Sequence, residues 1–285
     1  MPHAPIIAIL PYGLRKSRNL AATPLTELTV FGPAENITTL GDLGPQDHLL
    51  LNCCGRTLFG RYPGLRCKIS LLLAEPRGVQ ARYYRIIPLL HRRFYAILTH
   101  DCDLIRKLPN ALRHSAALAT ITPVDDPEKS AITSLIASKR NDLTGHRLRH
   151  EIANWARAHN IFLNLYGRAY KGIADKTEAL APYHFSVVIE NSRENGYFTE
   201  KLVDCLLTKT VPIYWGAPDI SQHFNTDGMI TCTSPADIQS AISTVTKQKY
   251  QQMLPAIVEN FTRAQLYCTP DKHAAETLGK SAFTS

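Results

Sequence analysis

The chain has 285 residues, of which 45% are hydrophobic and 20% are charged, a composition typical of a globular protein with room for two domains. No apolar run approaches the roughly 18–20 residues that cross a bilayer, so no membrane-spanning helix is predicted. Met1–Leu10 lacks the features of a secretory signal, so no signal peptide is predicted. The net charge of +8 indicates an anionic partner, but the basic residues form no block interleaved with aromatic residues, which argues against nucleic acid.

Short apolar runs separated by polar turns dominate the first hundred residues. They predict buried strands of a parallel sheet at Ile6–Leu10, His48–Asn52, Lys68–Leu73 and Phe94–Leu98. Residues 77–93 have helical spacing and a dense basic face. That face is either simply solvated or in contact with an anionic acceptor or lipid surface, which makes peripheral membrane contact a candidate role for helix 77–93.

Glu75 follows the third of these strands directly and precedes a proline. Pro76 ends the strand and favours an extended conformation for Glu75, at the carboxyl edge of the sheet. A general base of an α/β enzyme is commonly found at such an edge, although a merely solvated carboxylate is the alternative.

No metal site is predicted. Asp101 and Asp103 form a DxD pair, which we interpret as a helix cap, because a lone DxD occurs often by chance. The seven cysteines show no CxxC spacing and are predicted to be reduced.

Residues 111–129 contain prolines without clear periodicity and are predicted to link two lobes. We therefore expect an N-terminal domain over 1–122, a C-terminal domain over 130–265 and a C-terminal tail over 266–285 that is frayed after Thr269. The second lobe is predicted to begin with the strand Ile132–Ala137, which is followed by a basic loop that runs from Ser138 into a helix. Cations between a strand and a helix suit a diphosphate, because guanidinium binds phosphate oxygens bidentately.

The most informative stretch is Tyr183–Pro218. An apolar strand ends in Glu190-Asn191, and a polar loop leads to a helix that begins after Thr199, a predicted N-cap. Lys201 in the first turn is unfavourable for the helix dipole unless an anion binds there. A surface ion pair is the alternative.

Residues 190–218, ENSRENGYFTEKLVDCLLTKTVPIYWGAP, closely resemble the signature of glycosyltransferase family 10, the α-1,3/α-1,4-fucosyltransferases. Upstream, the residues around Gly167 resemble the family's FGR, and Lys176 and Tyr183 keep the register of its approach to the signature. The resemblance is strong over about residues 130–230 and faint over the first hundred.

The resemblance implies an α/β fold of two Rossmann-like lobes that face a cleft, the GT-B type. It implies an inverting glycosyltransferase that moves fucose from GDP-β-L-fucose to a hydroxyl of an oligosaccharide or glycoconjugate acceptor, with α-linkage, and that needs neither a tightly bound cofactor nor a divalent metal. Golgi members of the family carry a membrane anchor that this chain lacks, so a cytoplasmic location is expected.

The resemblance also implies roles for individual residues. Glu75 matches the family's catalytic glutamate. The family also has an arginine that holds the donor diphosphate, which Arg147 matches by its spacing to the helix, with Arg149 and Lys139 as fallbacks. The other residues expected at the donor site are Asn191, Tyr197, Glu200 and Lys201. Further candidates are Glu190, Lys176 and Gly167.

Two alternatives stay open on the sequence. The same fold could use another GDP-sugar, because diphosphate contacts do not identify the hexose. The chain could also be an inactive protein that binds a nucleotide-sugar or a glycan, since its N-terminal lobe is short.

Overall fold

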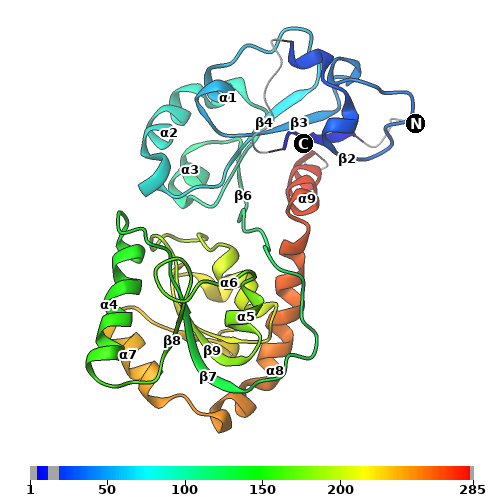
Figure 1. The fold of residues 1–285 in the computed structure, drawn as a ribbon. Coiled ribbons are helices and arrows are strands. Elements are labelled where there is room, and N and C mark those ends of the chain that lie inside the picture. Colours follow the sequence, from blue (N-terminus) through cyan, green and yellow to red (C-terminus); the bar gives the residue numbers. More distant parts are fainter. Residues whose placement is uncertain (1–4, 12–18, 283–285) are drawn as a thin grey trace. The chain divides into compact units, whose positions relative to one another are not determined.

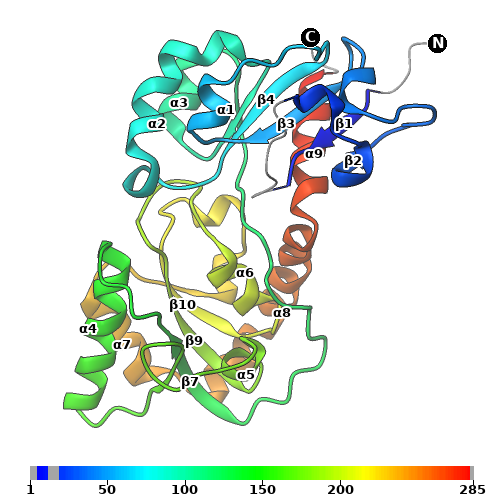
Figure 2. The ribbon, with the colours of Figure 1, turned by 45° about the horizontal axis from the view of Figure 1, so that its top comes forward.

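The computed structural model describes residues 5–11 and 19–282, which form two α/β units (Figures 1 and 2). The N-terminal unit comprises the chain up to Ala116 and the segment from Pro270 onward, and the C-terminal unit comprises Ala117–Thr269. The ends of the predicted domains, residues 1–4 and 283–285, lie outside the described residues. Among the described helices, none combines the length and the apolar character that a bilayer span requires.

The N-terminal unit is built on a six-stranded sheet of order β2-β1-β3-β4-β5-β6, in which only β1 and β2 are antiparallel neighbours. Its strands are β1 (Ile7–Ile9), β2 (Thr29–Phe31), β3 (His48–Asn52), β4 (Lys68–Leu73), β5 (Ile97–Thr99) and β6 (Ala111–Arg113). Its α-helices are α1 (Gly55–Phe59), α2 (Arg77–Leu90), α3 (Cys102–Lys107) and α9 (Pro270–Ala282). β3 and β4 have the predicted bounds, and Asp101 caps α3 as predicted by accepting a hydrogen bond from the Leu104 amide.

Helix α9 corrects the predicted tail and domain boundary. The prediction that the tail is frayed after Thr269 is wrong for the described residues, because α9 returns to the N-terminal unit and packs on its sheet (Figure 1). The buried apolar residues of the cluster formed at this contact are Ile7, Ile9, Leu50, Ala96, Leu98, Ala274, Ala275 and Leu278. The helix covers a sheet face that would otherwise expose apolar side chains to water, which favours its docking.

His48 is fully buried at the start of β3, and neither ring nitrogen has a hydrogen-bond partner among the described residues. Burial, with a smaller effect of Lys68, lowers the pKa of His48 to about 4. A histidine in the unfolded chain has a pKa near 6.5. Between pH 6.5 and about 4, His48 is therefore protonated in the unfolded chain but stays neutral in the native chain. Stability is therefore fully present above pH 6.5 and is lost as the pH falls toward 4.

We expect His48→Leu to remove this part of the acid sensitivity. Between pH 7.5 and 5.0, the free energy of unfolding of the wild type should fall by about 2 kcal/mol through His48 alone, and this part should be absent in the variant. Urea unfolding followed by circular dichroism at pH 7.5 and 5.0 measures the difference, and the other histidines cancel because both proteins carry them. An equal pH dependence of the two proteins would contradict this assignment.

The C-terminal unit is built on a five-stranded, all-parallel sheet of order β11-β10-β9-β7-β8. Its strands are β7 (Ala131–Ile136), β8 (Asn164–Tyr166), β9 (Tyr183–Ile189), β10 (Val211–Trp215) and β11 (Ile230–Thr231). Its α-helices are α4 (Thr144–Ala158), α5 (Thr177–Leu180), α6 (Glu200–Leu206), α7 (Pro235–Thr244) and α8 (Lys247–Ala264). Helices α4 and α7 lie on one face of the sheet and α5 and α6 on the other (Figures 1 and 2).

The central strands are buried on both faces, which explains their continuous apolar sequence. Phe185, Val187 and Ile189 of β9 pack in the cluster that includes α4 and α7, whereas Val188 packs with α6. This alternation is the two-residue period of a strand. Because β7 and β9 are parallel neighbours, their carboxyl ends lie at one edge of the sheet, where the polar loops to α4 and α6 begin.

Candidate functional site

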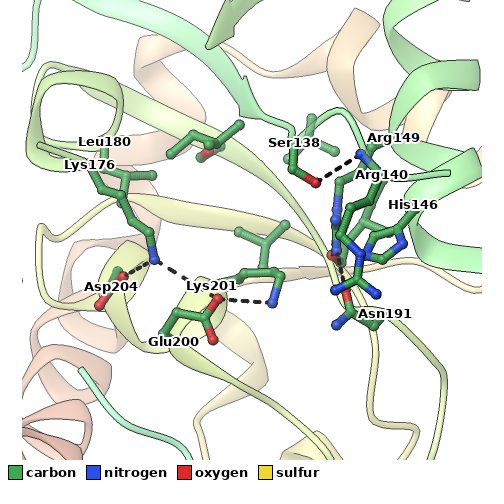
Figure 3. A pocket seen from close by; sticks show the side chains of 15 residues that line it. Ser138, Arg140, His146, Arg149, Lys176, Leu180, Asn191, Glu200, Lys201 and Asp204 are labelled. Carbon is green, nitrogen blue, oxygen red and sulfur yellow. Dashed lines mark hydrogen bonds and ion pairs between the residues drawn. The ribbon is translucent and has the colours of Figure 1, made fainter. Parts of the chain in front are cut away.

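A pocket of about 310 Å³ lies at the carboxyl ends of β7 and β9, beside the first turns of α4 and α6 (Figure 3). Its apolar lining includes Ile136, Val187 and Val188 from the two strands. Its polar lining residues are Ser138, Arg140, His146, Arg149, Lys176, Ser186, Asn191, Glu200, Lys201 and Asp204. Four of these residues are Lys or Arg and two are acidic, so the lining has a net positive charge.

Arg149 is the most buried of the four cations, with 5% of its surface exposed. Its Nε and Nη2 donate to the carbonyl oxygen of Ile189, at 3.0 and 2.5 Å, and Nη2 also donates to Asn191 Oδ1 at 3.0 Å. Burial lowers the pKa of Arg149, while the nearby carboxylates of Glu190 and Glu200 oppose that effect. These bonds fix the guanidinium at the end of β9 while Nη1 makes no hydrogen bond with the described residues.

Gly145 allows the first turn of α4 to touch the end of β9. Its N–H donates to the carbonyl of Asn191 at 3.1 Å, and a Cβ at this position would lie 1.7 Å from the carbonyl oxygen of Glu190. A separation that short is a hard overlap with backbone, so the helix could not keep its place if position 145 carried a side chain. The contact holds Arg149, one turn along α4, against the strand end.

We expect Gly145→Ala to destabilise the protein by about 2–4 kcal/mol, because the overlap must be relieved by moving a packed helix. Gly172→Ala is the matched control, since a Cβ there would meet no atom within 4 Å. Thermal unfolding of the two variants compares them directly. A Gly145→Ala variant as stable as Gly172→Ala would show that α4 is not held at this point.

Lys201 lies in the first turn of α6 among oxygen acceptors. Its Nζ donates to Thr199 Oγ1 at 2.9 Å and to Glu200 Oε1 at 3.0 Å, and it lies 3.6 Å from Glu190 Oε2. Glu190 is fully buried and accepts hydrogen bonds from both the N–H and the hydroxyl of Thr199, at 2.9 and 2.7 Å. The Glu190 carboxylate thus ties the end of β9 to the start of α6, and Thr199 caps that helix as predicted.

Glu200 is held as a carboxylate. Burial favours its neutral form, but Lys201 and Lys176 outweigh burial, and the pKa of Glu200 is lowered. An ionised carboxylate only accepts hydrogen bonds. Glu200 therefore offers the pocket an acceptor for the hydroxyls of a bound molecule.

Lys176 is anchored by a buried carboxylate on the opposite side of the pocket. Its Nζ donates to Asp204 Oδ2 at 2.8 Å and lies 4.0 Å from Glu200 Oε1. Asp204 is fully buried and also accepts from the N–H and hydroxyl of Thr120, at 2.8 and 2.5 Å. One carboxylate therefore fixes both a pocket lysine and the segment that precedes β7.

The loop from β7 to α4 and the first turn of α4 supply further polar groups. Arg140 forms a two-point ion pair with Asp142, at 3.1 and 2.7 Å, and Asp142 also lies 2.8 Å from Nδ1 of His146. Burial and the nearby Arg149 lower the pKa of His146. Figure 3 shows Arg140, His146 and Arg149 on one side of the pocket and Lys176 with Asp204 on the other.

The structure brings together most of the residues singled out from the sequence. Asn191, Glu200, Lys201, Lys176 and Arg149 all line the pocket, and Glu190 lies behind it. The charged or titratable pocket residues that were not selected from the sequence are Arg140, His146 and Asp204, and the polar Ser138 and Ser186 were not selected either.

Three selected residues lie elsewhere, and Arg147 is the main correction. Arg147 is exposed and donates to the carbonyl of Asp142 at 2.9 Å, because it projects from the outer face of α4, whereas Arg149 projects from the inner face. Tyr197 is buried but does not line the pocket. Gly167 has a φ of +94°, and its close approach is to the carbonyl of Ala137, 2.4 Å from an ideal Cβ, rather than to the pocket.

Glu75 belongs to the N-terminal unit. It is exposed in the loop between β4 and α2, and its main-chain carbonyl accepts a hydrogen bond from the Tyr84 hydroxyl at 2.8 Å. Both carboxylates of the DxD pair bind Arg77: Asp101 at 2.6 Å and Asp103 at 3.4 Å. Within the described part of the chain, no cluster of His, Cys, Asp and Glu is arranged to hold a metal ion.

Comparison with known proteins identifies relatives of the C-terminal unit. Residues 127–254 match the model of the family described as glycosyltransferase family 10 (fucosyltransferase), C-terminal. The chain is 26% identical over 130 residues to the α-(1,3)-fucosyltransferase FucT of Helicobacter pylori, a match that covers 46% of this chain and 27% of that protein. It is 39% identical over 66 residues to a putative fucosyltransferase-like protein of Arabidopsis thaliana, covering 22% of this chain and 13% of that protein. The matched region is thus about a quarter or less of the length of these relatives.

Solved structures support the fold. A crystal structure of an α1,3-fucosyltransferase superposes with a TM-score of 0.50 at 19% identity and covers 78% of this chain and 69% of that chain. A mutant of S. aureus TarM superposes with a TM-score of 0.56 at 11% identity and covers 92% of this chain and 61% of that chain. The two α/β units therefore have the fold of the GT-B glycosyltransferases, as predicted.

Proposed function

We propose that the chain, of which residues 127–254 match the model of glycosyltransferase family 10, is an inverting glycosyltransferase that uses GDP-fucose as its donor. The observation that carries the proposal is the pocket itself, in which four cations surround a cavity at the carboxyl edge of a parallel sheet. Nucleotides bind at this edge in open α/β folds, and an anionic diphosphate complements the net positive lining.

The donor diphosphate would lie between Arg149 and Lys201. The guanidinium of Arg149 is held by the backbone of β9, so it can meet the phosphate oxygens without first being ordered. Lys201 adds a second positive charge 2.9 Å from the Thr199 hydroxyl, and Lys176 and Arg140 extend the positive field to both sides. Asn191 and the ionised Glu200 would then contact hydroxyl groups of the ribose or the sugar.

The reaction would be a single displacement. The acceptor hydroxyl oxygen attacks C1 of fucose while the bond from C1 to the phosphate oxygen breaks, and GDP leaves with that electron pair. Arg149 and Lys201 stabilise the charge that grows on GDP. The hydroxyl proton passes to the carboxylate of Glu75, the general base, and inversion at C1 converts the β-linked donor into an α-linked product.

Calorimetric titration with GDP-fucose, GDP-mannose, UDP-galactose and GDP tests the donor assignment. We expect binding that requires guanine, that is strongest for the fucose donor, and that is lost in Lys201→Ala. A preference for GDP-mannose would instead identify a different GDP-sugar. If no guanine nucleotide binds, the proposed function is wrong.

A further inference from the structure

The positive charge of the chain is concentrated in one segment of the N-terminal unit. Residues 55–99 contain nine Lys or Arg residues and a single acidic residue, Glu75, and so have a net charge of +8. The rest of the chain contains 23 basic and 23 acidic residues and is neutral. The segment therefore accounts for the whole net charge, and it includes α1 and α2.

These two helices are direct neighbours. The N–H of Gly55 at the start of α1 donates to the Tyr83 hydroxyl of α2 at 2.9 Å. Arg93, just beyond α2, donates to the carbonyls of Leu58 and Gly60 at the end of α1, at 3.2 and 2.5 Å. The two helices therefore lie side by side, and the Arg82 guanidinium also lies close to Gly55 at the start of α1.

That surface combines arginines with large apolar side chains. Arg82, Arg85 and Leu89 are exposed and lie three or four residues apart, which places them along one side of α2. Arg92 is also exposed and lies in the short 3-10 helix His91–Arg93 that directly follows α2. Leu89 is 82% exposed, and Phe59 of α1 is 54% exposed. We call Arg56, Phe59, Arg82, Arg85, Leu89 and Arg92 the α1–α2 face.

We propose that the α1–α2 face binds the anionic surface of a lipid bilayer. The arginines would lie at the level of the lipid phosphates, and Leu89 and Phe59 would insert below them, as in other peripheral proteins that combine basic and apolar groups. A soluble polyanion would use the charge but would gain nothing from an aliphatic side chain that is four-fifths exposed. The exposed Leu89 therefore favours a membrane over a nucleic acid or a free polyphosphate. The proposal does not depend on the proposed function.

Flotation of the full chain with lipid vesicles tests the proposal. The wild type should bind vesicles of equal parts phosphatidylcholine and phosphatidylglycerol at low salt, bind more weakly as salt rises, and not bind pure phosphatidylcholine. Each arginine near the surface contributes about a fivefold gain in partitioning, so changing Arg82, Arg85 and Arg92 together to Ser should reduce binding by roughly a hundredfold. The double variant Phe59→Ser and Leu89→Ser should reduce binding by about tenfold with the charge unchanged.

Matched controls distinguish binding through the α1–α2 face from a general effect of net charge. Changing Arg157, Lys247 and Lys249 of the C-terminal unit to Ser removes the same number of cations and should leave binding nearly unchanged, apart from a small effect of net charge. Circular dichroism checks that each variant is folded, and calorimetry with GDP checks the donor pocket separately. Failure of the wild type to bind anionic vesicles, or equal losses in the control and the face variants, would overturn the proposal. The proposal would also be overturned if the Phe59→Ser and Leu89→Ser double variant bound both long-chain polyphosphate and vesicles as strongly as the wild type does.

Discussion

Replacing Arg149 with alanine is expected to weaken donor binding by about a hundredfold or more. Charge-assisted hydrogen bonds contribute about 1.5–3 kcal/mol each, and a guanidinium in this place could make two with a diphosphate. The same change leaves the carbonyl of Ile189 and the amide of Asn191 without their partner, which should lower the free energy of unfolding by about 1–3 kcal/mol. Calorimetry with GDP measures the first effect, and urea unfolding measures the second.

Arg147→Ala provides the matched control two residues away. It removes the same charge from the same helix, but the side chain is exposed and does not line the pocket. We expect its affinity for GDP to stay within about twofold of wild type and its stability to change by less than about 0.5 kcal/mol. The reverse ranking, with Arg147→Ala the weaker binder, would restore the assignment made from the sequence.

Replacing Glu75 with glutamine is expected to reduce turnover by about 10²–10⁴-fold, because the amide is nearly isosteric with the carboxylate but cannot accept the acceptor proton. The affinity for GDP-fucose should not change, because the donor pocket lies wholly in the C-terminal unit. Release of GDP in the presence of a panel of oligosaccharides measures turnover, and calorimetry measures the affinity. The carboxylate makes no hydrogen bond or ion pair with the described residues, so little effect on stability is expected.

Glu35→Gln controls for the loss of one exposed carboxylate in the same unit. It should turn over like the wild type. If Glu75→Gln also keeps full turnover, the general base is another group. If the wild type binds GDP-fucose yet transfers the sugar to no acceptor, the chain is better described as a nucleotide-sugar-binding protein.

Much of the fold was accessible from sequence because the buried strands have clear ends. The predicted strands His48–Asn52 and Lys68–Leu73 have their observed bounds, since each is a mostly apolar run that begins at a polar residue. The strands β2 and β6 are three residues long at the edges of their sheet, too short to show a period. Helix α9 was missed because its buried positions are mostly alanines, a weak apolar signal whose burial depends on a sheet far away in sequence.

The site was predictable where side chains follow a regular element and less so where they depend on a loop. The choice between Arg147 and Arg149 could have been made from helical phase, because Arg149 shares a face with Ile152 and Ala156, which are buried. Asp204 could also have been selected, because it is a lone carboxylate inside an apolar helical segment. Arg140 lies in an irregular loop, and no spacing rule places its side chain at the pocket.

Helix α9 sets an order in which the protein can fold during synthesis. The C-terminal unit is a continuous segment, so all its parts have been synthesised once Thr269 is made. The N-terminal unit begins earlier, but one face of its sheet stays uncovered until Ala274, Ala275 and Leu278 have also left the ribosome. Domains of a nascent chain commonly fold in order from the N-terminus. Here we expect the unit that is translated first to mature last, with its apolar strands in need of protection throughout the synthesis of the other unit.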